Sequence, residues 1–224
     1  MAGIKRKSAG KQGLKLRKIY NLLDGHFGDL GWWPAGSDFE VIVGSILTQN
    51  TAWSNVEKAI TALKREGLLE PDKILRMDTG RLSRLIRPAG YYRIKALRLK
   101  EISRFVMAEC EGKMRRLRAR NTEKLRESLL AVKGVGPETA DSILVYALEK
   151  PVFVVDAYTK RIFSRHGLIQ GNASYDEVQS LVRGHFPPDS RILNQFHAFL
   201  VETGKRFCRK KAGLCEKCPL RHVS

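Results

Sequence analysis

Acidic residues, cysteines and long apolar stretches are all scarce in this sequence. No apolar run is long enough to span a bilayer and no secretory signal core is present, so we expect an intracellular protein, cytoplasmic and nucleoid-associated if its source is prokaryotic, that makes no use of a membrane. Only four cysteines occur, and three are clustered, a pattern that inside cells indicates a metal site more often than disulfides. No turn dipeptide separates alternating strands, so β-hairpins are not expected.

The shortage of acid leaves a net charge of +18, concentrated in three segments. Residues 1–20 carry seven Lys or Arg and no acid, residues 92–120 carry ten against three acids, and residues 203–224 carry seven against one. Charge gathered in patches favours a polyanionic partner, because each phosphate contact releases counterions. One alternative is a solubilising, disordered tail over residues 1–12. An anionic membrane surface is a weaker one, since no basic helix gathers Trp, Phe or Leu on one face.

Helical patterns dominate the rest of the chain, whose length allows one large domain or two small ones. The run SDFEVIVGSILTQNT begins at an N-cap, Ser37 or Asp38, and is apolar almost all round, as a buried helix is. One face of the run TADSILVYALEK consists of Ala140, Ile143, Leu144, Ala147 and Leu148. Further helices are predicted near residues 14–26, 53–66, 92–110, 121–131, 157–166, 173–184 and 188–206.

The apolar run VFVV at residues 152–155 leads directly into Asp156 and a helical pattern. It reads better as a buried approach to a helix than as a strand, so we expect an all-α fold. Asp156 then has two interpretations: an ordinary N-cap, or a carboxylate in a dry setting whose field acts on a developing cation. A residue can be both.

Gly134 and Gly136 flank Val135 immediately before a helix. Glycine lets the backbone turn tightly and approach a ligand, and a helix N-terminus directs N–H groups outward, so a phosphate is a natural occupant. A plain turn between two helices is the simpler interpretation of this pair taken alone.

An ordered set of motifs adds to this pattern: LTQNT on an apolar helix, AGYYRIKA, VKGVGPETA, VVDAYTKRI and C-x6-C-x2-C. Together, from residue 38 to the C-terminus, they resemble the endonuclease III branch of the helix-hairpin-helix DNA glycosylases. The resemblance implies two helical domains with a substrate cleft between them. One would be discontinuous, from residues 1–37 plus 151–224 with a metal loop, and the other, residues 38–150, would be a six-helix domain carrying the hairpin.

The same resemblance implies roles for particular residues. Asp156 matches the aspartate that drives loss of the base, and the hairpin turn would hold a DNA phosphate through the backbone of Lys133, Gly134, Val135 and Gly136. By position, Gln49 and Tyr91 would enter the duplex when the base leaves, although Gln49 could instead cap a helix and Tyr91 could be ordinary packing. We expect a monomer that binds double-stranded DNA containing a damaged base.

Glu138 departs from the strand-cutting members, which carry a lysine nucleophile at this position. A carboxylate cannot form an imine, so the sequence favours a monofunctional glycosylase that leaves an abasic site. Lys133 and Lys205 are conceivable substitutes but do not fall on the motif position. Lys205 is in any case a candidate DNA contact in the basic C-terminal segment.

Tryptophans gather near the first buried helix, where they either seal the core or line a pocket for a flipped base. An electron-rich indole face would favour a cationic base such as an N-alkylated purine. WWPA, TQNT and IRPAG with YY resemble the 3-methyladenine glycosylases of the endonuclease III type, and Glu138 agrees with that subgroup. The candidate base-pocket residues are Trp32, Trp33, Pro34, Trp53 and Glu138.

Cys208, Cys215 and Cys218 are the candidate metal ligands. The resemblance implies a [4Fe–4S] cluster, but the position of its fourth cysteine is Ser224. Alternatives are a zinc site, in which His222 would complete a Cys3His set, or no metal. Cys110 is expected to be a small buried residue of a helix in the other domain.

These patterns predict excision of alkylated purines such as 3-methyladenine in base excision repair. Alternatives of the same class are a mismatch thymine or uracil glycosylase and a bifunctional glycosylase with AP lyase activity. A damage-recognising DNA-binding module without catalysis is the non-enzymatic alternative.

Overall fold

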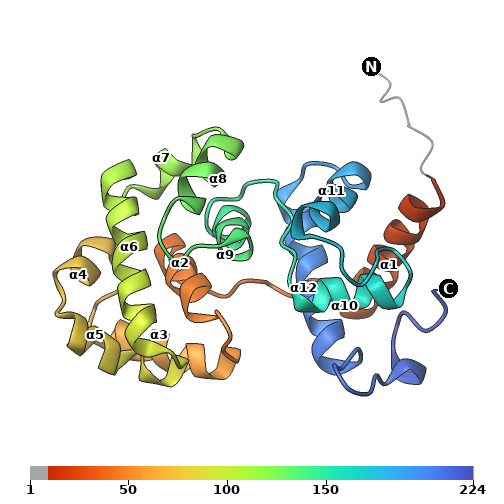
Figure 1. The fold of residues 1–224 in the computed structure, drawn as a ribbon, viewed down its shortest axis with the longest axis horizontal. Helices are drawn as coiled ribbons and strands as arrows, with labels where there is room; N and C mark the ends of the chain where they lie inside the picture. Colours follow the sequence, from red (N-terminus) through yellow and green to blue (C-terminus); the bar gives the residue numbers. More distant parts are fainter. Residues whose placement is uncertain (1–9, 224) are drawn as a thin grey trace. The chain divides into compact units, whose positions relative to one another are not determined.

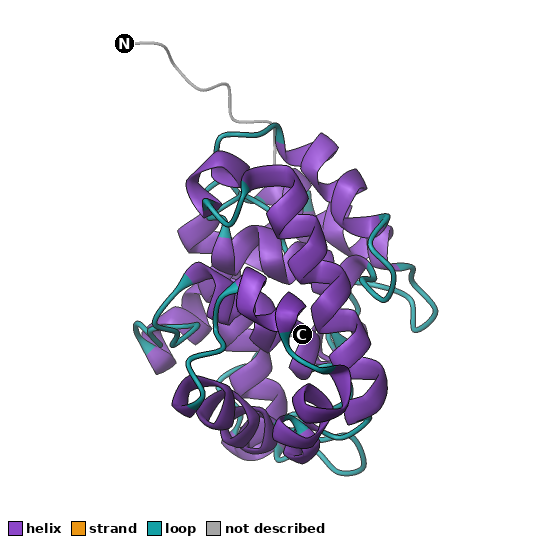
Figure 2. Cartoon of the chain, turned by 90° about the vertical axis from the view of Figure 1, so that its left-hand side faces the viewer, coloured by secondary structure: helices purple, strands orange, loops and turns teal. Residues whose placement is uncertain are grey.

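The computed structural model describes residues 10–223, in which every regular element is a helix (Figure 2). The all-α class expected from the sequence is therefore confirmed. The basic residues before Gly10 and the candidate ligand Ser224 lie outside the described residues. No helix within residues 10–223 has the length and apolar character needed to cross a membrane.

The chain divides into two compact units (Figure 1). One comprises Met1–Trp32 and Pro151–Ser224, and the other comprises Trp33–Lys150. The first boundary lies between Trp32 and Trp33, whereas the sequence places it after residue 37. We call the first the outer unit, because both ends of the sequence build it. The second, one continuous segment from the middle of the sequence, is the inner unit.

The inner unit contains helices of very different lengths. They are α2 (Asp38–Leu47), α3 (Trp53–Arg65), α4 (Pro71–Arg76), α5 (Thr79–Leu85), η1 (Arg87–Ala89), α6 (Tyr92–Cys110), α7 (Met114–Arg118), α8 (Thr122–Leu130), α9 (Pro137–Ser142) and η2 (Ile143–Ala147). η1 is a 3-10 helix, and η2 is a π-helical segment that continues α9 directly.

Helix α2 forms the centre of the inner unit. Its N-cap is Ser37, whose Oγ accepts from the N–H of Glu40, so of the two candidates Ser37 and Asp38 the first is the cap. Every residue from Phe39 to Leu47 is buried, as its apolar pattern predicts. Helices α3, α6 and η2 pack around it, with α6 the long helix beside α4 and α5 in Figure 1. The Glu40 carboxylate is satisfied by Lys64 at 2.6 Å and by the Gly36 N–H at 2.9 Å.

The outer unit contains α1 (Lys11–Phe27), α10 (Ala157–Arg165), α11 (Tyr175–His185), α12 (Ser190–Arg206) and the 3-10 helix η3 (Cys215–Lys217). Its core joins Leu16, Ile19 and Leu23 of α1 to Phe196 and Phe199 of α12. Helix α1, from the start of the chain, therefore completes a core that residues after 151 supply. Phe153, Val154 and Val155, just before Asp156, are buried, and the run leads into α10 without forming a strand, as expected.

Candidate active site and nucleic-acid interface

Asp156 lies at the N-terminus of α10 and caps it. One carboxylate oxygen accepts from the Thr159 N–H at 2.7 Å, and the other lies 3.6 Å from Nε2 of His197 on α12. The Asp156 side chain is only 12% exposed and that of His197 only 8%. The anion is therefore fixed by a helix N-terminus on one side and an imidazole on the other.

The environment of Asp156 acts on its pKa in two directions. Burial raises the pKa, but the contact and charge of His197 and the bond from the Thr159 N–H outweigh burial, so the pKa lies below its ordinary value. A carboxylate of this kind is anionic at neutral pH and a weak proton acceptor. It suits electrostatic stabilisation of a developing cation better than proton abstraction.

The hairpin consists of α8, the turn after it and α9. Gly134 has φ of 89°, the left-handed region, and a Cβ there would lie 2.6 Å from Cγ of Arg98. Gly136 is the N-cap of α9 at φ of −97°, and nothing lies within 4 Å of where its Cβ would be. The first glycine is thus required by the fold itself, while the second leaves open space beside the backbone.

A buried ion pair joins the two helices of the hairpin. Arg126 of α8 donates from Nε and Nη2 to the two carboxylate oxygens of Asp141, at 2.7 and 3.1 Å. The Asp141 side chain is 0% exposed. A two-point bond between a planar guanidinium and a carboxylate fixes the angle between the helices and so the shape of the turn.

Gln49, the candidate for entering the duplex, is bonded to the hairpin. Its Nε2 donates to the carbonyl of Gly134 at 3.1 Å and to Oγ1 of Thr139 at 2.9 Å, and its Oε1 accepts from Arg98. It does not cap α2, whose C-cap is Thr48. Any other placement of the Gln49 side chain would require these bonds to break.

Tyr91 is strongly exposed, at 72%, so it is not core packing. It precedes α6 in the left-handed conformation, with φ of 44° and ψ of 30°. A bulky residue rarely adopts this conformation unless its surroundings impose it. The side chain is presented to solvent from a constrained backbone.

Trp33 and Trp53 meet edge to face, with ring centroids 5.0 Å apart. Tyr146, in the π-helical segment, lies 5.2 Å from Trp33 on another side. Trp33 also packs on α2, where a Cβ on Gly44 would meet its ring at 3.0 Å. The structure thus brings two of the predicted pocket residues together, while Pro34 and Glu138 are exposed in the same unit.

Trp32 belongs to the outer unit, where Nζ of Lys205 lies 5.3 Å from its ring centroid. Nζ of Lys205 also lies 3.1 Å from a carboxylate oxygen of Glu202. An imine-forming amine must be neutral and free to attack, so these contacts with an anion and an aromatic face do not favour Lys205 as a nucleophile. Lys133 is exposed in the hairpin turn.

The three clustered cysteines line one cavity of about 220 Å³, together with Arg165 and His166 of the α10 end. Burial raises the pKa of the Cys218 thiol, and the neighbouring Cys208 and Cys215 raise it further. Within residues 10–223 no three His, Cys, Asp or Glu side chains are placed to hold a single metal ion.

His222, the candidate zinc ligand, accepts a hydrogen bond from Nε of Arg221 at 2.8 Å. His166, which the sequence did not single out, lines the cavity, and its Nδ1 lies 2.9 Å from the carbonyl of Val223. Cys110, as expected, is a buried residue of a helix, the last of α6.

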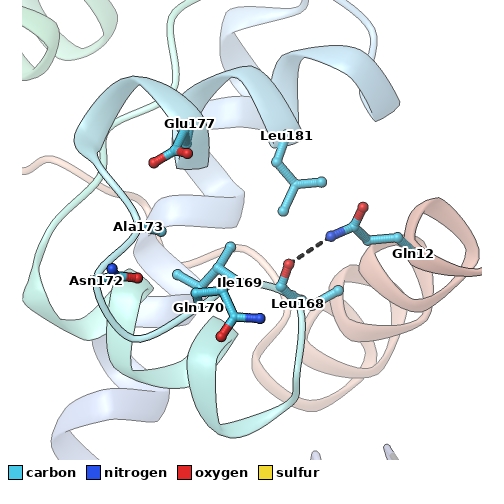
Figure 3. A pocket seen from close by; sticks show the side chains of 8 residues that line it. All are labelled: Gln12, Leu168, Ile169, Gln170, Asn172, Ala173, Glu177 and Leu181. Carbon is cyan, nitrogen blue, oxygen red and sulfur yellow. Dashed lines mark hydrogen bonds between the residues drawn. The ribbon is translucent and has the colours of Figure 1, made fainter.

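Another hollow of about 380 Å³ lies in the outer unit between the start of α1 and the segment before α11 (Figure 3). In Figure 3 the Gln12 side chain donates to the carbonyl of Leu168, at 2.6 Å. None of the predicted site residues lines it. The candidate site is therefore elsewhere.

Comparison with known proteins completes this description. Residues 43–188 match the model of the HhH-GPD superfamily of base excision DNA repair proteins. A protein of Methanocaldococcus jannaschii, provisionally described as a DNA repair glycosylase, is 50% identical over 205 residues, covering 91% of this chain and 93% of that protein. Endonuclease III of Thermotoga maritima is 31% identical over 184 residues, covering 82% and 81%. The crystal structure of the H. pylori 3-methyladenine DNA glycosylase bound to 1,N6-ethenoadenine has a TM-score of 0.74 at 30% identity, covering 87% of this chain and 97% of that one.

Proposed function

Since the chain belongs to the HhH-GPD superfamily of base excision DNA repair proteins, we propose that it is a monofunctional DNA glycosylase that removes alkylated purines and leaves the strand uncut. The superfamily and the similarity to DNA glycosylases rest on the matches above. The substrate and the absence of strand cutting rest on particular residues.

Asp156 carries the proposal. Breaking the bond between a purine and deoxyribose builds positive charge on the sugar, as in other reactions with an oxocarbenium-like transition state. A buried anion with a lowered pKa is already charged when that cation develops, so it need not be reorganised at the moment of reaction. Its helix-capping bond holds it in place. The water that completes the hydrolysis would be oriented by the same carboxylate.

The hairpin would hold the DNA backbone. At Gly136 the open space beside the main chain allows a phosphate to approach the N-terminal amides of the helix, and the pair Arg126–Asp141 keeps the turn in shape. Such a contact positions the duplex without reading its sequence. The exposed Lys133 adds positive charge at the same turn.

Glu138 supports a monofunctional reaction because it stands where strand-cutting members of the family carry a lysine. It lies in the first turn of α9, where an anion is favoured by the helix dipole. The alternative nucleophile Lys205 is engaged with Glu202 and Trp32. Release of the base would therefore leave an abasic site and an intact strand.

The paired rings of Trp33 and Trp53 support a flipped, cationic base as substrate. An indole face attracts a positive charge, and N-alkylated purines carry one. Alkylation also weakens the bond to the sugar, so one carboxylate would suffice for catalysis. The solved relative from H. pylori, a 3-methyladenine DNA glycosylase bound to 1,N6-ethenoadenine, favours the same class of base.

The cofactor that we propose is a [4Fe–4S] cluster, on the resemblance of the C-x6-C-x2-C spacing to endonuclease III. Cys208, Cys215 and Cys218 would hold it, with the fourth ligand from Ser224, His222 or the adjacent His166. A bound cluster would tie the C-terminal loop together rather than take part in hydrolysis. Arg165 donates to Sγ of Cys208 at 3.2 Å and to the carbonyl of Arg209 at 2.9 Å, which orders the loop around this site.

The test is a base-release assay on duplexes that contain methylated, deaminated or oxidised bases, with the free base identified and strand cleavage scored in the same reaction. We expect release of alkylated purines, intact strands, and no covalent adduct after borohydride reduction. A trapped adduct would establish the alternative of a bifunctional glycosylase with AP lyase activity. Preferred release of thymine or uracil from mismatches would establish a mismatch glycosylase. Tight binding to damaged duplexes with no release of any base would leave a DNA-binding module.

A further inference from the structure

One buried side chain, that of Lys95, forms hydrogen bonds to two loops of the inner unit that we expect to enter the duplex. Lys95, on the first turn of α6, is 1% exposed. Its Nζ donates to the carbonyl of Leu47 at 2.8 Å and to Oγ1 of Thr51 at 2.7 Å, on either side of Gln49. It also donates to the carbonyl of Ala89 at 2.8 Å, two residues before Tyr91.

The three bonds use all three donors of the ammonium group. Thr51 strengthens the connection, because its hydroxyl accepts from Lys95 and donates to the same carbonyl of Ala89, at 2.5 Å. The acceptors are two carbonyls and a hydroxyl, and burial, with the like charge of Arg98, lowers the pKa of Lys95 to about 8. A methionine would fill this space without burying a charge, so packing alone does not account for a lysine here.

In each of the two loops bonded to Lys95, one residue has an uncommon backbone conformation. Asn50 in the first loop has φ of 53° and Tyr91 in the second has φ of 44°, both in the left-handed region. Non-glycine residues stay there only when the surrounding structure imposes it. Lys95 and Thr51 supply such a constraint to both loops at once.

We propose that Lys95 is a positioning residue that sets the spacing of the loop of residues 48–51 and the loop of residues 87–91, so that Gln49 and Tyr91 enter the duplex together as the base leaves. Lys95 touches neither the DNA nor the reacting atoms. It acts through the two loops, and its effect is confined to substrates whose base must be extracted from a pair. This inference rests on the proposed function for its substrate.

The first experiment measures opening of the base pair directly. The Asp156→Asn protein is bound to a duplex, and permanganate reactivity of the thymine opposite the target base reports its unstacking. Lys95→Met is compared with Lys100→Met, since Lys100 lies on the same helix and likewise donates to two carbonyls, those of Leu75 and Met77 at 2.8 and 2.6 Å. We expect Lys95→Met to lower the reactivity about tenfold, the usual effect of losing a charge-assisted bond, and Lys100→Met to leave it within about twofold.

The second experiment measures rescue in the otherwise wild-type enzyme. The damaged base is placed opposite either its normal partner or an abasic analogue, where no pair must be opened. We expect Lys95→Met to slow release from the paired substrate about tenfold and to approach wild type on the unpaired one. Thr51→Val removes the shared hydroxyl but keeps the ammonium. It should also slow release from the paired substrate more than release from the unpaired one, and it replaces Lys95→Met if that variant does not fold.

Equal losses on paired and unpaired substrates, or permanganate reactivity unchanged in both Lys95→Met and Thr51→Val, would overturn the positioning role. A wild-type protein that releases no base from any substrate would refute the proposed function instead. The permanganate comparison still decides the role of Lys95 in that event, because it needs DNA binding and opening but no catalysis.

Discussion

At the scale of single residues, one substitution can separate the helix-capping role of Asp156 from the catalytic role that we propose for it. Asparagine caps helices as well as aspartate does, so Asp156→Asn keeps the cap and removes the charge. We expect base release to fall by a factor of about 10²–10³ with little change in thermal stability. Single-turnover release, with the melting temperature measured in parallel, checks this.

Asp189→Asn is the matched control, because Asp189 caps α12 in the same unit by accepting from the Arg191 N–H at 2.8 Å. It should leave the rate unchanged. A rate loss shared by both variants, or an Asp156→Asn enzyme that keeps its activity, would remove Asp156 from catalysis.

If Asp156 has the proposed catalytic role, His197 should influence how far the activity extends into acid. Burial alone raises the pKa of Asp156, and the contact and charge of His197 are the largest influence that lowers it. In His197→Phe, whose ring keeps the packing on Phe153, burial dominates and the pKa of Asp156 rises. Since the role proposed for Asp156 needs the ionised carboxylate, the acid limb of the single-turnover rate against pH should move to higher pH. An unmoved acid limb would show that His197 does not set this ionisation.

At the scale of elements, replacing the two glycines of the hairpin should have different effects on stability and on DNA affinity. Gly134→Ala places a Cβ in the left-handed region and against Arg98, so it should destabilise the free protein by about 1–3 kcal/mol. Gly136→Ala has an ordinary φ and open space, so unfolding should be nearly unchanged while affinity for duplex DNA falls. Chemical denaturation and DNA titration separate the two effects. Unchanged affinity in Gly136→Ala would argue against a close phosphate at this turn.

Elements whose pattern is local could be predicted from the sequence, and those set by distant contacts could not. An N-cap of α2 at Ser37 or Asp38, the buried run before Asp156 and the hairpin follow from neighbouring residues. The short helices α4, α5 and α7 carry too few residues for a periodic pattern, so the sequence did not indicate them. The sequence predicts an ordinary helix where the π-helical segment follows α9, because no particular residue type indicates the wider turn.

The residues of the candidate site also differ in whether local sequence indicates them. The apolar run before Asp156 and the helix after it predict an N-cap, which the structure has, while its catalytic role comes from the family resemblance and stays a prediction. His197 could not be predicted, because it meets Asp156 only once α12 packs on α10. Lys95 was counted within a basic segment, although it is buried. Charge along the sequence cannot tell a lysine that meets phosphate from one that holds two loops.

At the scale of the whole molecule, the proposed cluster should stabilise the cysteine loop. Cys215→Ser removes one thiolate from the cavity that Cys208 and Cys218 share, so we expect loss of bound iron and visible absorption and a lower melting temperature. Cys110→Ser is the control, because a hydroxyl keeps the bond to the carbonyl of Val106. Iron and sulfide analysis with the absorption spectrum measures both. Zinc in place of iron would refute the cluster.

The two-part outer unit has a consequence for synthesis on the ribosome. Leu16, Ile19 and Leu23 of α1 emerge first, but the phenylalanines of α12 that cover them are made about 170 residues later. At 5–20 residues per second this apolar face waits roughly 10–30 s without its partners, while the continuous inner unit is already complete. The N-terminal helix is therefore the segment of the nascent chain most in need of a chaperone.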